Sequence, residues 1–300
     1  IIGEREVFVV DPGYWPSTAR DDIRQIRAWT NKPVRYVLST HWHHDHCFNN
    51  SVYADSFPTV GIIAHEETKA DMDLYVGTAL ARIVDGINTS KTQLQSGKDN
   101  SGNVLSKDDR TAIEQSIVQR EIVVNEWKPL TYRSPNITFT QDINFDIGGC
   151  EVYVRYFGRG NTTGDAVVYL PKEKIVITGD LLVHPMPYTY DGYPSEWVKT
   201  LKRIENLDAE TIIPGHGEIF HDKKYLVLVT NWMKSAIDQM NTRLKVVGPA
   251  EFRTFEEVKD HVDLSEFRQA FAGDDKNLND RFDQASALLI KLVFKEAALR

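Results

Sequence analysis

Four of the nine histidines of this 300-residue chain fall between positions 41 and 46, in the run Thr40-His41-Trp42-His43-His44-Asp45-His46. The run begins where an apolar segment, Val34–Thr40, ends, and this segment is typical of a buried strand. Ligands of α/β proteins bind where such strands end. Imidazole and carboxylate groups are good zinc ligands, and a tight turn can direct several of them to one place. The run therefore predicts a metal site at the edge of a sheet.

The segments around this run alternate between strand and helix. Val7–Val10 and Val60–Ala64 are predicted strands. Ser17–Trp29 has helical spacing and opens with a Ser-Thr pair that is a candidate cap. This rhythm indicates a layered α/β fold.

Residues 66–130 have a different composition, rich in Asp, Lys, Gln, Ser and Ala. We predict helices at Leu74–Ile87 and Asp108–Val123 around a mobile loop, Ser96–Ser106. The segment is interpreted as a helical insertion that could serve as a lid, as an oligomer contact or simply as packing.

Short strands return after the insertion, followed by helices to the end of the chain. The predicted strands are Ile137–Thr140, Glu151–Phe157, Ala166–Leu170, Lys174–Thr178 and Ile212–Pro214. The predicted helices are Glu196–Asn206, Lys224–Val246, Thr254–Phe271 and Asn279–Ala298.

Composition excludes several classes of protein. Hydrophobic residues at 41% and charged residues at 26% are ordinary values for a globular protein and argue against disorder. No apolar run is long enough to span a membrane. The net charge of −8 makes nucleic acid an unexpected partner, and two cysteines exclude a disulfide scaffold.

The sequence does not determine the cellular compartment of the protein. The chain opens with Ile1-Ile2-Gly3, without an initiator Met or a signal-peptide pattern. We expect that an upstream segment was removed or not included. The protein is then cytoplasmic, or exported if that segment held a signal peptide.

The run His41-x-His43-x-Asp45-His46 resembles the signature of the metallo-β-lactamase superfamily. Three further motifs of that family follow in its order: Gly158–Asp165, Thr178-Gly179-Asp180 and Pro214-Gly215-His216-Gly217. The resemblance covers about residues 1–220 and implies a four-layer αββα sandwich with two metal positions at one edge. It predicts a catalytic domain at 1–222, with the helical insertion at about 66–130, and a C-terminal helical extension at 223–300 packed on that domain.

The resemblance also implies the metal ligands. His41 and His43 would bind a first metal, Asp45, His46 and His216 a second, and Asp180 would bridge the two. The implied cofactor is zinc, one or two ions per chain, with iron and manganese as open alternatives. In the family a hydroxide held between the metals attacks a carbonyl or phosphoryl centre. Asp45, the candidate catalytic residue, could orient that hydroxide or carry its proton.

Asn161 departs from the family pattern, which places a third histidine of the first metal at this position. An amide oxygen is a weaker zinc ligand than imidazole. Two readings stay open: the first site is weakened and one metal dominates, or Asn161 is a weaker ligand and two metals still bind.

Lesser candidates surround these motifs. His184 and Tyr188 are candidate substrate contacts, with a supporting or packing role as the alternative for each. His44 is expected to support its neighbours or lie at the surface, and Cys47 to be a small buried thiol rather than a ligand.

The leading hypothesis is a hydrolase whose metal-bound hydroxide attacks an ester, thioester, lactone or amide of a small to medium molecule, with weak β-lactamase activity as an open addition. The alternatives are an iron-dependent oxidoreductase of the same fold, a nuclease or phosphodiesterase, and a module without activity. The expected partner is a small-molecule substrate, and an oligomer could form through the insertion or the C-terminal helices. Substrate and native metal lie beyond the sequence.

Overall fold

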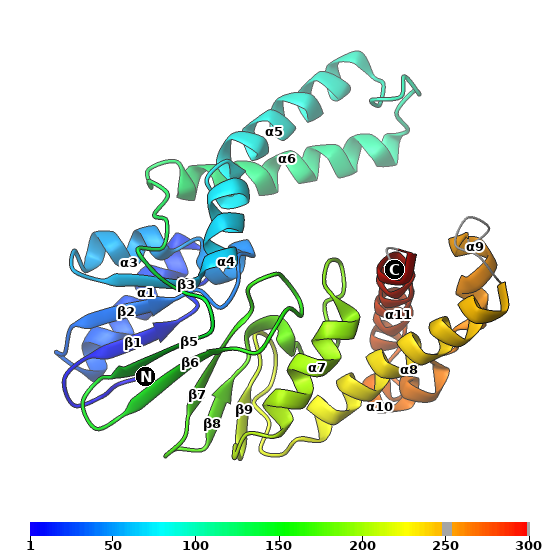
Figure 1. Cartoon of the computed structure of the whole chain (residues 1–300). Helices are drawn as coiled ribbons and strands as arrows, with labels where there is room; N and C mark the ends of the chain where they lie inside the picture. Colours follow the sequence, from blue (N-terminus) through cyan, green and yellow to red (C-terminus); the bar gives the residue numbers. More distant parts are fainter. Residues whose placement is uncertain (248–253, 299–300) are drawn as a thin grey trace. The chain divides into compact units, whose positions relative to one another are not determined.

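A computed structural model of the chain describes residues 1–247 and 254–298 (Figure 1). The chain divides into two compact units. Unit 1 comprises Ile1, Glu6–Ile63 and Lys69–Ile137, and unit 2 comprises Ile2–Arg5, Ala64–Thr68 and the described residues from Thr138 onward. The boundary at residue 222 stays a prediction, and residues 248–253 and 299–300 of the predicted extension lie outside the described residues.

The first sheet has the strand order β1-β2-β3-β4. Its strands are β1 (Val7–Val10), β2 (Val34–Leu38), β3 (Gly61–His65) and β4 (Ile137–Phe139). Strands β1, β2 and β3 pair in parallel, so their carboxyl ends lie at one edge. A buried apolar cluster that includes Val7, Val37 and Ile62 joins this sheet to α1 (Pro16–Trp29) and α3 (Asn50–Ser56).

The start of α1 differs from the prediction. The helix begins at Pro16, and the Ser-Thr pair does not cap it. Proline suits the first helical position because its fixed φ is already helical and its missing N–H has no partner to lose. Ser17 instead donates from its backbone N and its Oγ to Glu126, at 2.9 and 3.0 Å. The serine thus attaches α1 to the insertion.

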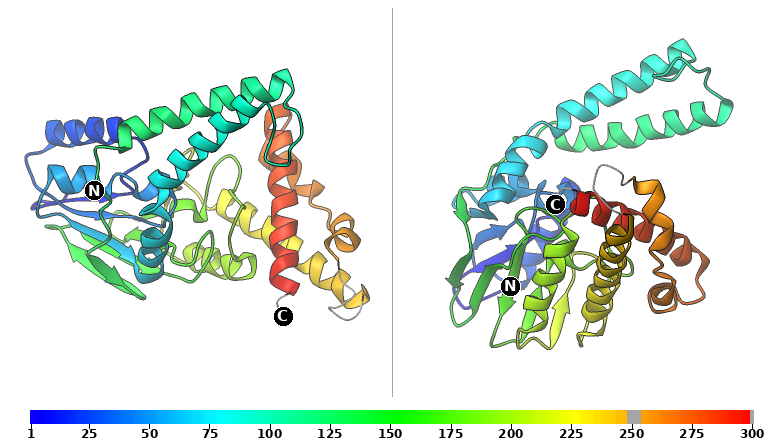
Figure 2. Two further views of the ribbon diagram at one scale, coloured as in Figure 1. Left: turned by 90° about the horizontal axis from the view of Figure 1, so that it is seen from above. Right: turned by 45° about the vertical axis from the view of Figure 1, so that its right-hand side comes forward.

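The insertion consists of consecutive helices, as predicted, but the bounds of its two long helices differ: the first begins and ends later than predicted, and the second is longer at both ends. The helices are α4 (Glu66–Asp71), a π-helix at Met72–Val76, α5 (Ala79–Ser96) and α6 (Lys107–Trp127). α5 and α6 run side by side as an antiparallel pair in all views (Figures 1 and 2). Gly97, with φ 71°, ends α5, and Ser106 begins α6 with a reciprocal capping box to Asp109.

The second sheet has the strand order β5-β6-β7-β8-β9. Its strands are β5 (Asp142–Asp146), β6 (Glu151–Tyr156), β7 (Ala166–Leu170), β8 (Ile175–Ile177) and β9 (Thr211–Ile213). Only the β8–β9 pair among them is parallel. The apolar core of unit 2 lies between this sheet and three helices, α7 (Pro194–Glu205), α8 (Lys224–Val247) and α11 (Lys276–Ala298).

The predicted single helix at Thr254–Phe271 is wrong. The structure has α9 (Phe255–Val258), 3-10 turns at Lys259–His261 and Ser265–Phe267, and α10 (Arg268–Ala272). Both backbone groups of Asp263 bond to the Gln239 side chain, at 2.8 and 2.7 Å, and its carboxylate accepts from Ser265 N at 2.8 Å. These contacts replace helical hydrogen bonds and break the helix.

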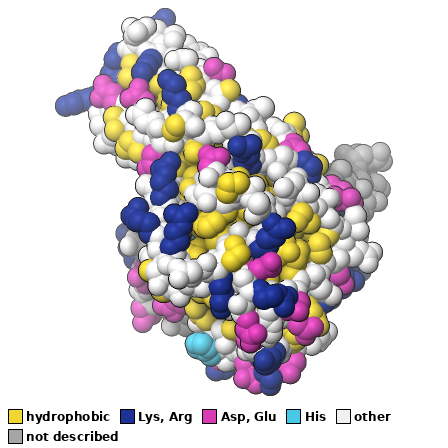
Figure 3. Space-filling view, turned by 90° about the vertical axis from the view of Figure 1, so that its left-hand side faces the viewer, with side chains coloured by type: hydrophobic (Ala, Val, Ile, Leu, Met, Phe, Trp, Pro, Cys, Tyr) yellow, Lys and Arg dark blue, Asp and Glu magenta, His cyan; other side chains and the backbone are white. Residues whose placement is uncertain are grey.

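Within the described residues, no helix has the length and apolarity that crossing a membrane requires. On the face shown in Figure 3, Lys and Arg side chains are interspersed with acidic and apolar ones. The expectation about nucleic acid stays a prediction.

Candidate metal centre

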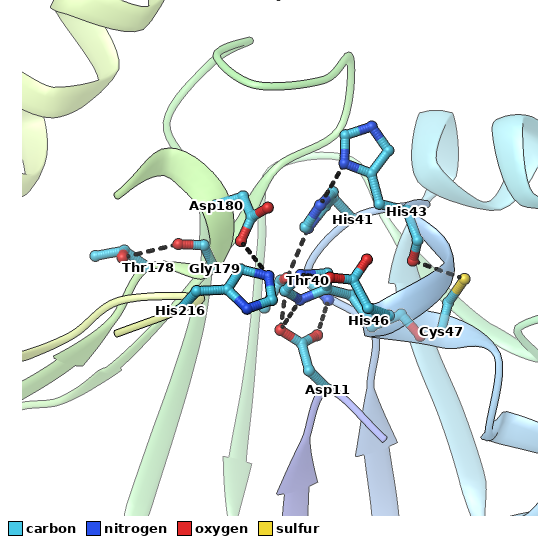
Figure 4. A network of polar contacts seen from close by, with 12 residues as sticks. Asp11, Thr40, His41, His43, His46, Cys47, Thr178, Gly179, Asp180 and His216 are labelled. Carbon is cyan, nitrogen blue, oxygen red and sulfur yellow. Dashed lines mark hydrogen bonds and ion pairs between the residues drawn. The ribbon is translucent and has the colours of Figure 1, made fainter. Parts of the chain in front are cut away.

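Asp11 organises the edge of unit 1 where β1 and β2 end (Figure 4). It follows β1 directly, and its carboxylate accepts from Thr40 N at 2.7 Å and Thr40 Oγ1 at 2.9 Å. Its Oδ2 also lies 2.7 Å from His46 Nδ1. A carboxylate only accepts, so Nδ1 of His46 carries a proton, and Nε2 is the ring nitrogen left for a metal ion. Sequence reasoning missed this residue, although Asp11-Pro12-Gly13 ends a predicted strand.

Thr40 orients His41 in the same way. Its hydroxyl donates to Asp11 and lies 3.0 Å from His41 Nδ1, which therefore donates to Oγ1. His41 is fully buried, and its Nε2 lies 3.0 Å from Nδ1 of the half-buried His43. Two imidazole nitrogens thus point toward one place.

Asp45 and His46 lie on α2 (His44–Cys47), a single helical turn after the extended His43. Asp45 Oδ2 is 3.4 Å from His46 Nε2, the ring nitrogen that does not contact Asp11. The change from extended chain to helical turn therefore presents a second pair of ligand atoms from the same loop.

His44 and Cys47 turn away from these pairs. The His44 ring stacks on Phe48 with centroids 4.4 Å apart, and burial lowers its pKa. The Cys47 thiol donates to the carbonyls of Trp42 and His43, both at 3.2 Å. Burial raises its pKa well above the usual range, so it is a protonated thiol, as expected.

Asp180 and His216 form the corresponding edge of unit 2, after the parallel strands β8 and β9 (Figure 4). Asp180 is nearly buried in a 3-10 turn, and its Oδ1 lies 3.5 Å from His216 Nε2. A Cβ on Gly215 would come within 2.0 Å of that oxygen. The Pro-Gly-His motif therefore needs glycine at position 215, because any side chain there would collide with the Asp180 carboxylate.

Asn161 is fully buried in the loop between β6 and β7 of unit 2. Neither its Oδ1 nor its Nδ2 has a hydrogen-bond partner among the described residues. A buried amide without partners is destabilising. An oxygen without a hydrogen bond is compatible with the ligand position that the motif implies, and this role of Asn161 stays a prediction.

Asp165 holds this loop in shape. Its Oδ2 accepts from Gly160 N at 3.1 Å and Thr162 N at 2.8 Å, and its Oδ1 accepts from Thr162 Oγ1 at 3.0 Å. Burial is the main cause that raises its pKa to about 7, and the charge of Asp180 adds to the effect. The carboxyl braces the backbone on both sides of Asn161.

The structure gives His184 and Tyr188 different surroundings. His184 packs edge-on against Phe220 and Tyr225, with centroids 5.3 and 5.1 Å away. Tyr188 is exposed beside Tyr190. Trp197, on α7, is buried, and its Nε1 donates to Leu181 O at 3.1 Å, which supports the turn that carries Asp180. Substrate contact by His184 or Tyr188 stays a prediction.

The donors of unit 1 fit zinc. Zn–N bonds of 2.0–2.1 Å in tetrahedral geometry place two ligand nitrogens about 3.3 Å apart. The His41–His43 and Asp45–His46 atom pairs, at 3.0 and 3.4 Å, have this spacing. The second nitrogens of His41 and His46 are held by oxygen acceptors, as is usual for metal-binding histidines.

Comparisons with curated proteins find relatives that each match part of this chain. Linear primary-alkylsulfatase of Pseudomonas sp. is 22% identical over 77% of this chain and 43% of its own length. Metallo-beta-lactamase IND-1 of Chryseobacterium indologenes is 37% identical over 25% of this chain and 34% of its own. The chain spans less than half the length of these relatives, which are hydrolytic enzymes.

Solved structures share the fold. A metallo-beta-lactamase from Pontibacter korlensis superposes with a TM-score of 0.52 at 20% identity, covering 78% of this chain and 85% of that one. DIM-1 metallo-beta-lactamase gives 0.53 at 18% identity, covering 79% and 85%. Both confirm the predicted α/β fold class. The family model of the metallo-beta-lactamase superfamily matches residues 1–216, and the chain belongs to that superfamily.

Proposed function

We propose that the protein is a metal-dependent hydrolase of a small or medium ester, thioester, lactone or amide. The observation that carries the proposal is the orientation of the histidines by Asp11 and Thr40. Packing requires no such network, whereas metal-binding imidazoles need a fixed tautomer.

We assign the ligands to two metal positions. His41, His43 and Asp180 would hold the first ion. Asp45, His46 and His216 would hold the second, with Asp180 shared between the ions. Both sets combine imidazole and carboxylate donors, as zinc prefers.

The two positions would differ in strength because Asn161 supplies an amide in place of a third imidazole. Its buried, unpartnered oxygen supports a role as a weak ligand. The second position is then the tighter one.

Zinc, when bound, lowers the pKa of a coordinated water to about 7 and so supplies a nucleophile at neutral pH. Asp45 is the residue placed to accept the proton of the attacking water, since its carboxylate is half-exposed beside His46. Asp11 and Thr40 keep the histidine lone pairs aligned throughout.

The substrate could instead be a sulfate ester. This second candidate rests on the alkylsulfatase relative, whose match covers 77% of this chain. Weak β-lactam hydrolysis is a further activity to test.

Elemental analysis of protein purified without an affinity tag tests the metal, with Asp180→Ala as the depleted variant. His221→Ala is a matched control, because His221 is an exposed histidine outside both sets. One or two equivalents of zinc, lost in Asp180→Ala and kept in His221→Ala, support the proposal. Negligible metal in the wild type overturns it.

A substrate panel then tests the reaction, with carboxylic esters, thioesters, lactones, β-lactams, alkyl sulfates and phosphodiesters. Carbonyl hydrolysis that His216→Ala abolishes and His221→Ala retains supports the leading class. Exclusive turnover of sulfates or phosphodiesters selects the respective alternative. Bound iron with oxygen consumption selects the oxidoreductase.

A further inference from the structure

Trp42 is a large aromatic side chain in the loop of candidate metal ligands, yet it is only half-buried. It stands between His41 and His43 in the sequence, and its ring packs edge-on against the His43 ring with centroids 4.6 Å apart. The Trp42 ring also lies 4.8 Å from the ring of Tyr75, tilted by 33°. Tyr75 is itself 37% exposed. Two aromatic rings that reach solvent are thus joined to a candidate ligand.

Tyr75 lies in an irregular turn of the insertion. This turn is the π-helix Met72–Val76, in which Gly77 N donates to Met72 O at 3.1 Å and closes the wider ring of atoms. Single π-helical turns are rare and occur frequently at functional sites. The irregular turn that presents Tyr75 to Trp42 is therefore a second observation that points to function.

Arg82, on α5, is held against Tyr75. Its guanidinium carbon lies 5.9 Å from the centre of the Tyr75 ring, and its Nη2 donates to the Tyr75 carbonyl. The side chain is exposed, and among the described residues it has no carboxylate partner. An exposed arginine usually loses conformational freedom when it binds, but the two contacts with Tyr75 already restrain this one. Arg82 is therefore a cation fixed in place with N–H donors left to offer.

These contacts form a continuous row, from the ring of His43 through Trp42 and Tyr75 to the Arg82 guanidinium. A guanidinium matches a carboxylate with paired N–H donors, and aromatic rings favour flat or apolar groups. The net charge of −8 repels acidic molecules in general, so a site that selects one needs a local cation. The row fits a molecule with a carboxylate at one end and a flat segment that leads toward the ligand loop.

We propose that Arg82 binds a carboxylate of the substrate, and that Trp42 and Tyr75 contact the segment between this carboxylate and the reacting group. The inference rests on the proposed hydrolase and specifies its substrate as an acidic ester or related acyl compound. Arg82 is then a specificity residue. If Arg82 served only to bind the Tyr75 carbonyl, the enzyme would show no preference between acidic and neutral substrates.

Binding to the metal-free protein tests the site without turnover and without direct contact between a carboxylate and a metal ion. The probes are biphenyl-4-carboxylate and biphenyl-4-carboxamide, because they share two rings and differ in charge, and calorimetry follows their binding. We expect the carboxylate to bind about fivefold more tightly, the upper range for one exposed ion pair. Added salt should reduce this preference.

Variants of Arg82 separate its charge from its contact with Tyr75. Arg82→Gln keeps an N–H donor for the Tyr75 carbonyl but has no charge, so it should bind both probes equally at an unchanged melting temperature. Arg82→Lys keeps the charge without the paired donors and should retain part of the preference. Equal binding of the two probes by wild type, or an unchanged preference in Arg82→Gln, overturns the proposal.

Two further variants test the rings and the long-range charge. Trp42→Ala should weaken both probes by similar factors, because the ring contacts the segment that they share. Arg20→Gln is the matched control, since Arg20 is an exposed arginine on α1 of the same unit, and it should retain the full preference. Loss of the preference in Arg20→Gln would show that net charge, rather than Arg82, selects the carboxylate and would overturn the proposal.

Kinetics of the metal-loaded enzyme test the link to substrate. Monomethyl terephthalate and methyl benzoate share the ring and the methyl ester and differ in the remote carboxylate. Arg82→Gln should raise KM about fivefold for the acidic ester and leave KM for methyl benzoate unchanged. Equal changes for both esters overturn the role in substrate binding.

The two failures can be told apart. Ester hydrolysis without a carboxylate preference rejects the role of Arg82 alone. Carboxylate-selective binding without hydrolysis of any ester rejects the proposed function, and with it the substrate role of Arg82.

Discussion

The Asp11 carboxylate and the His46 imidazole meet at 2.7 Å, although 35 positions separate them in the chain. The contact exists because β1 and β2 are parallel neighbours whose carboxyl ends share one edge. Asp11 directly follows the end of β1 at this edge. The loop that carries the candidate ligands of residues 41–46 follows the end of β2. The same carboxylate binds Thr40, which in turn orients His41. One residue outside the histidine motif thus sets the tautomer of two of its rings.

Replacing Asp11 with Asn should therefore weaken metal binding about 10- to 100-fold. The amide oxygen can still accept from Thr40, but its NH₂ group would donate to His46 Nδ1. That contact moves the ring proton to Nε2, the ligand atom. Competition with a chelator measures the affinity. Asp85→Asn, an exposed change in the same unit, is the control, and equal affinity of Asp11→Asn and wild type would refute the role of Asp11.

Gly215→Ala should lower the proposed hydrolase activity at least about 100-fold. The new Cβ would lie only 2.0 Å from Asp180 Oδ1, so the carboxylate would have to move. It would also lie 2.8 Å from the backbone carbon of Gly179, so the melting temperature should fall. Gly86→Ala is the control, since its nearest contact is the flexible end of Arg120 and alanine favours the helix. A Gly215→Ala enzyme with wild-type activity would show that the Asp180 carboxylate need not stay in place.

Local patterns in the sequence predicted much of the fold. Val7–Val10 has the predicted bounds, because a short apolar run between turn residues specifies a strand by itself. The motifs also located the candidate ligands, whose roles stay predictions. β5 was missed because its alternate residues Asp142, Asn144 and Asp146 face solvent, and such polar residues read as a turn.

The remaining features depend on contacts between distant segments. The role of Asp11 depends on the pairing of β1 with β2, which no local pattern contains. The break in the predicted helix at Thr254–Phe271 depends on Gln239 of α8, which takes both backbone groups of Asp263. The contact between the Phe48 and Trp127 rings, with centroids 3.9 Å apart, likewise joins segments that are far apart in sequence. Sequence reasoning fails where a tertiary partner decides the outcome.

Asn161→Leu should stabilise the metal-free protein by about 1 kcal/mol, because it removes a buried amide that has no hydrogen-bond partner. The same change should reduce metal binding, with the weaker equivalent lost first. Urea denaturation with and without zinc measures both effects. Thr162→Val is the contrasting variant, since its hydroxyl does bond to Asp165 and its loss should destabilise. A less stable Asn161→Leu protein would show that the amide is satisfied in solution.

Asp165 should make the stability of the metal-free protein depend on pH. Burial raises its folded pKa to about 7 from an ordinary value of 3.8, so the folded state favours the protonated acid. Its contribution is fully present below pH 3.8, is lost progressively as the pH rises to about 7, and then stays constant. The loss amounts to about 4 kcal/mol at most.

The difference in unfolding free energy between wild type and Asp165→Asn isolates the contribution of Asp165. Other carboxyls change the stability in the opposite direction, such as Asp73, whose pKa is lowered by hydrogen bonds from Lys69, Ser134 and Tyr132. The asparagine keeps an acceptor for the Gly160 and Thr162 N–H groups and does not titrate. Denaturation at intervals from pH 4 to pH 8 should show wild type losing stability relative to Asp165→Asn up to about pH 7. The exposed change Asp280→Asn controls for net charge. A constant difference across this range would show that Asp165 is ionised throughout, and that the loop around Asn161 tolerates a buried charge.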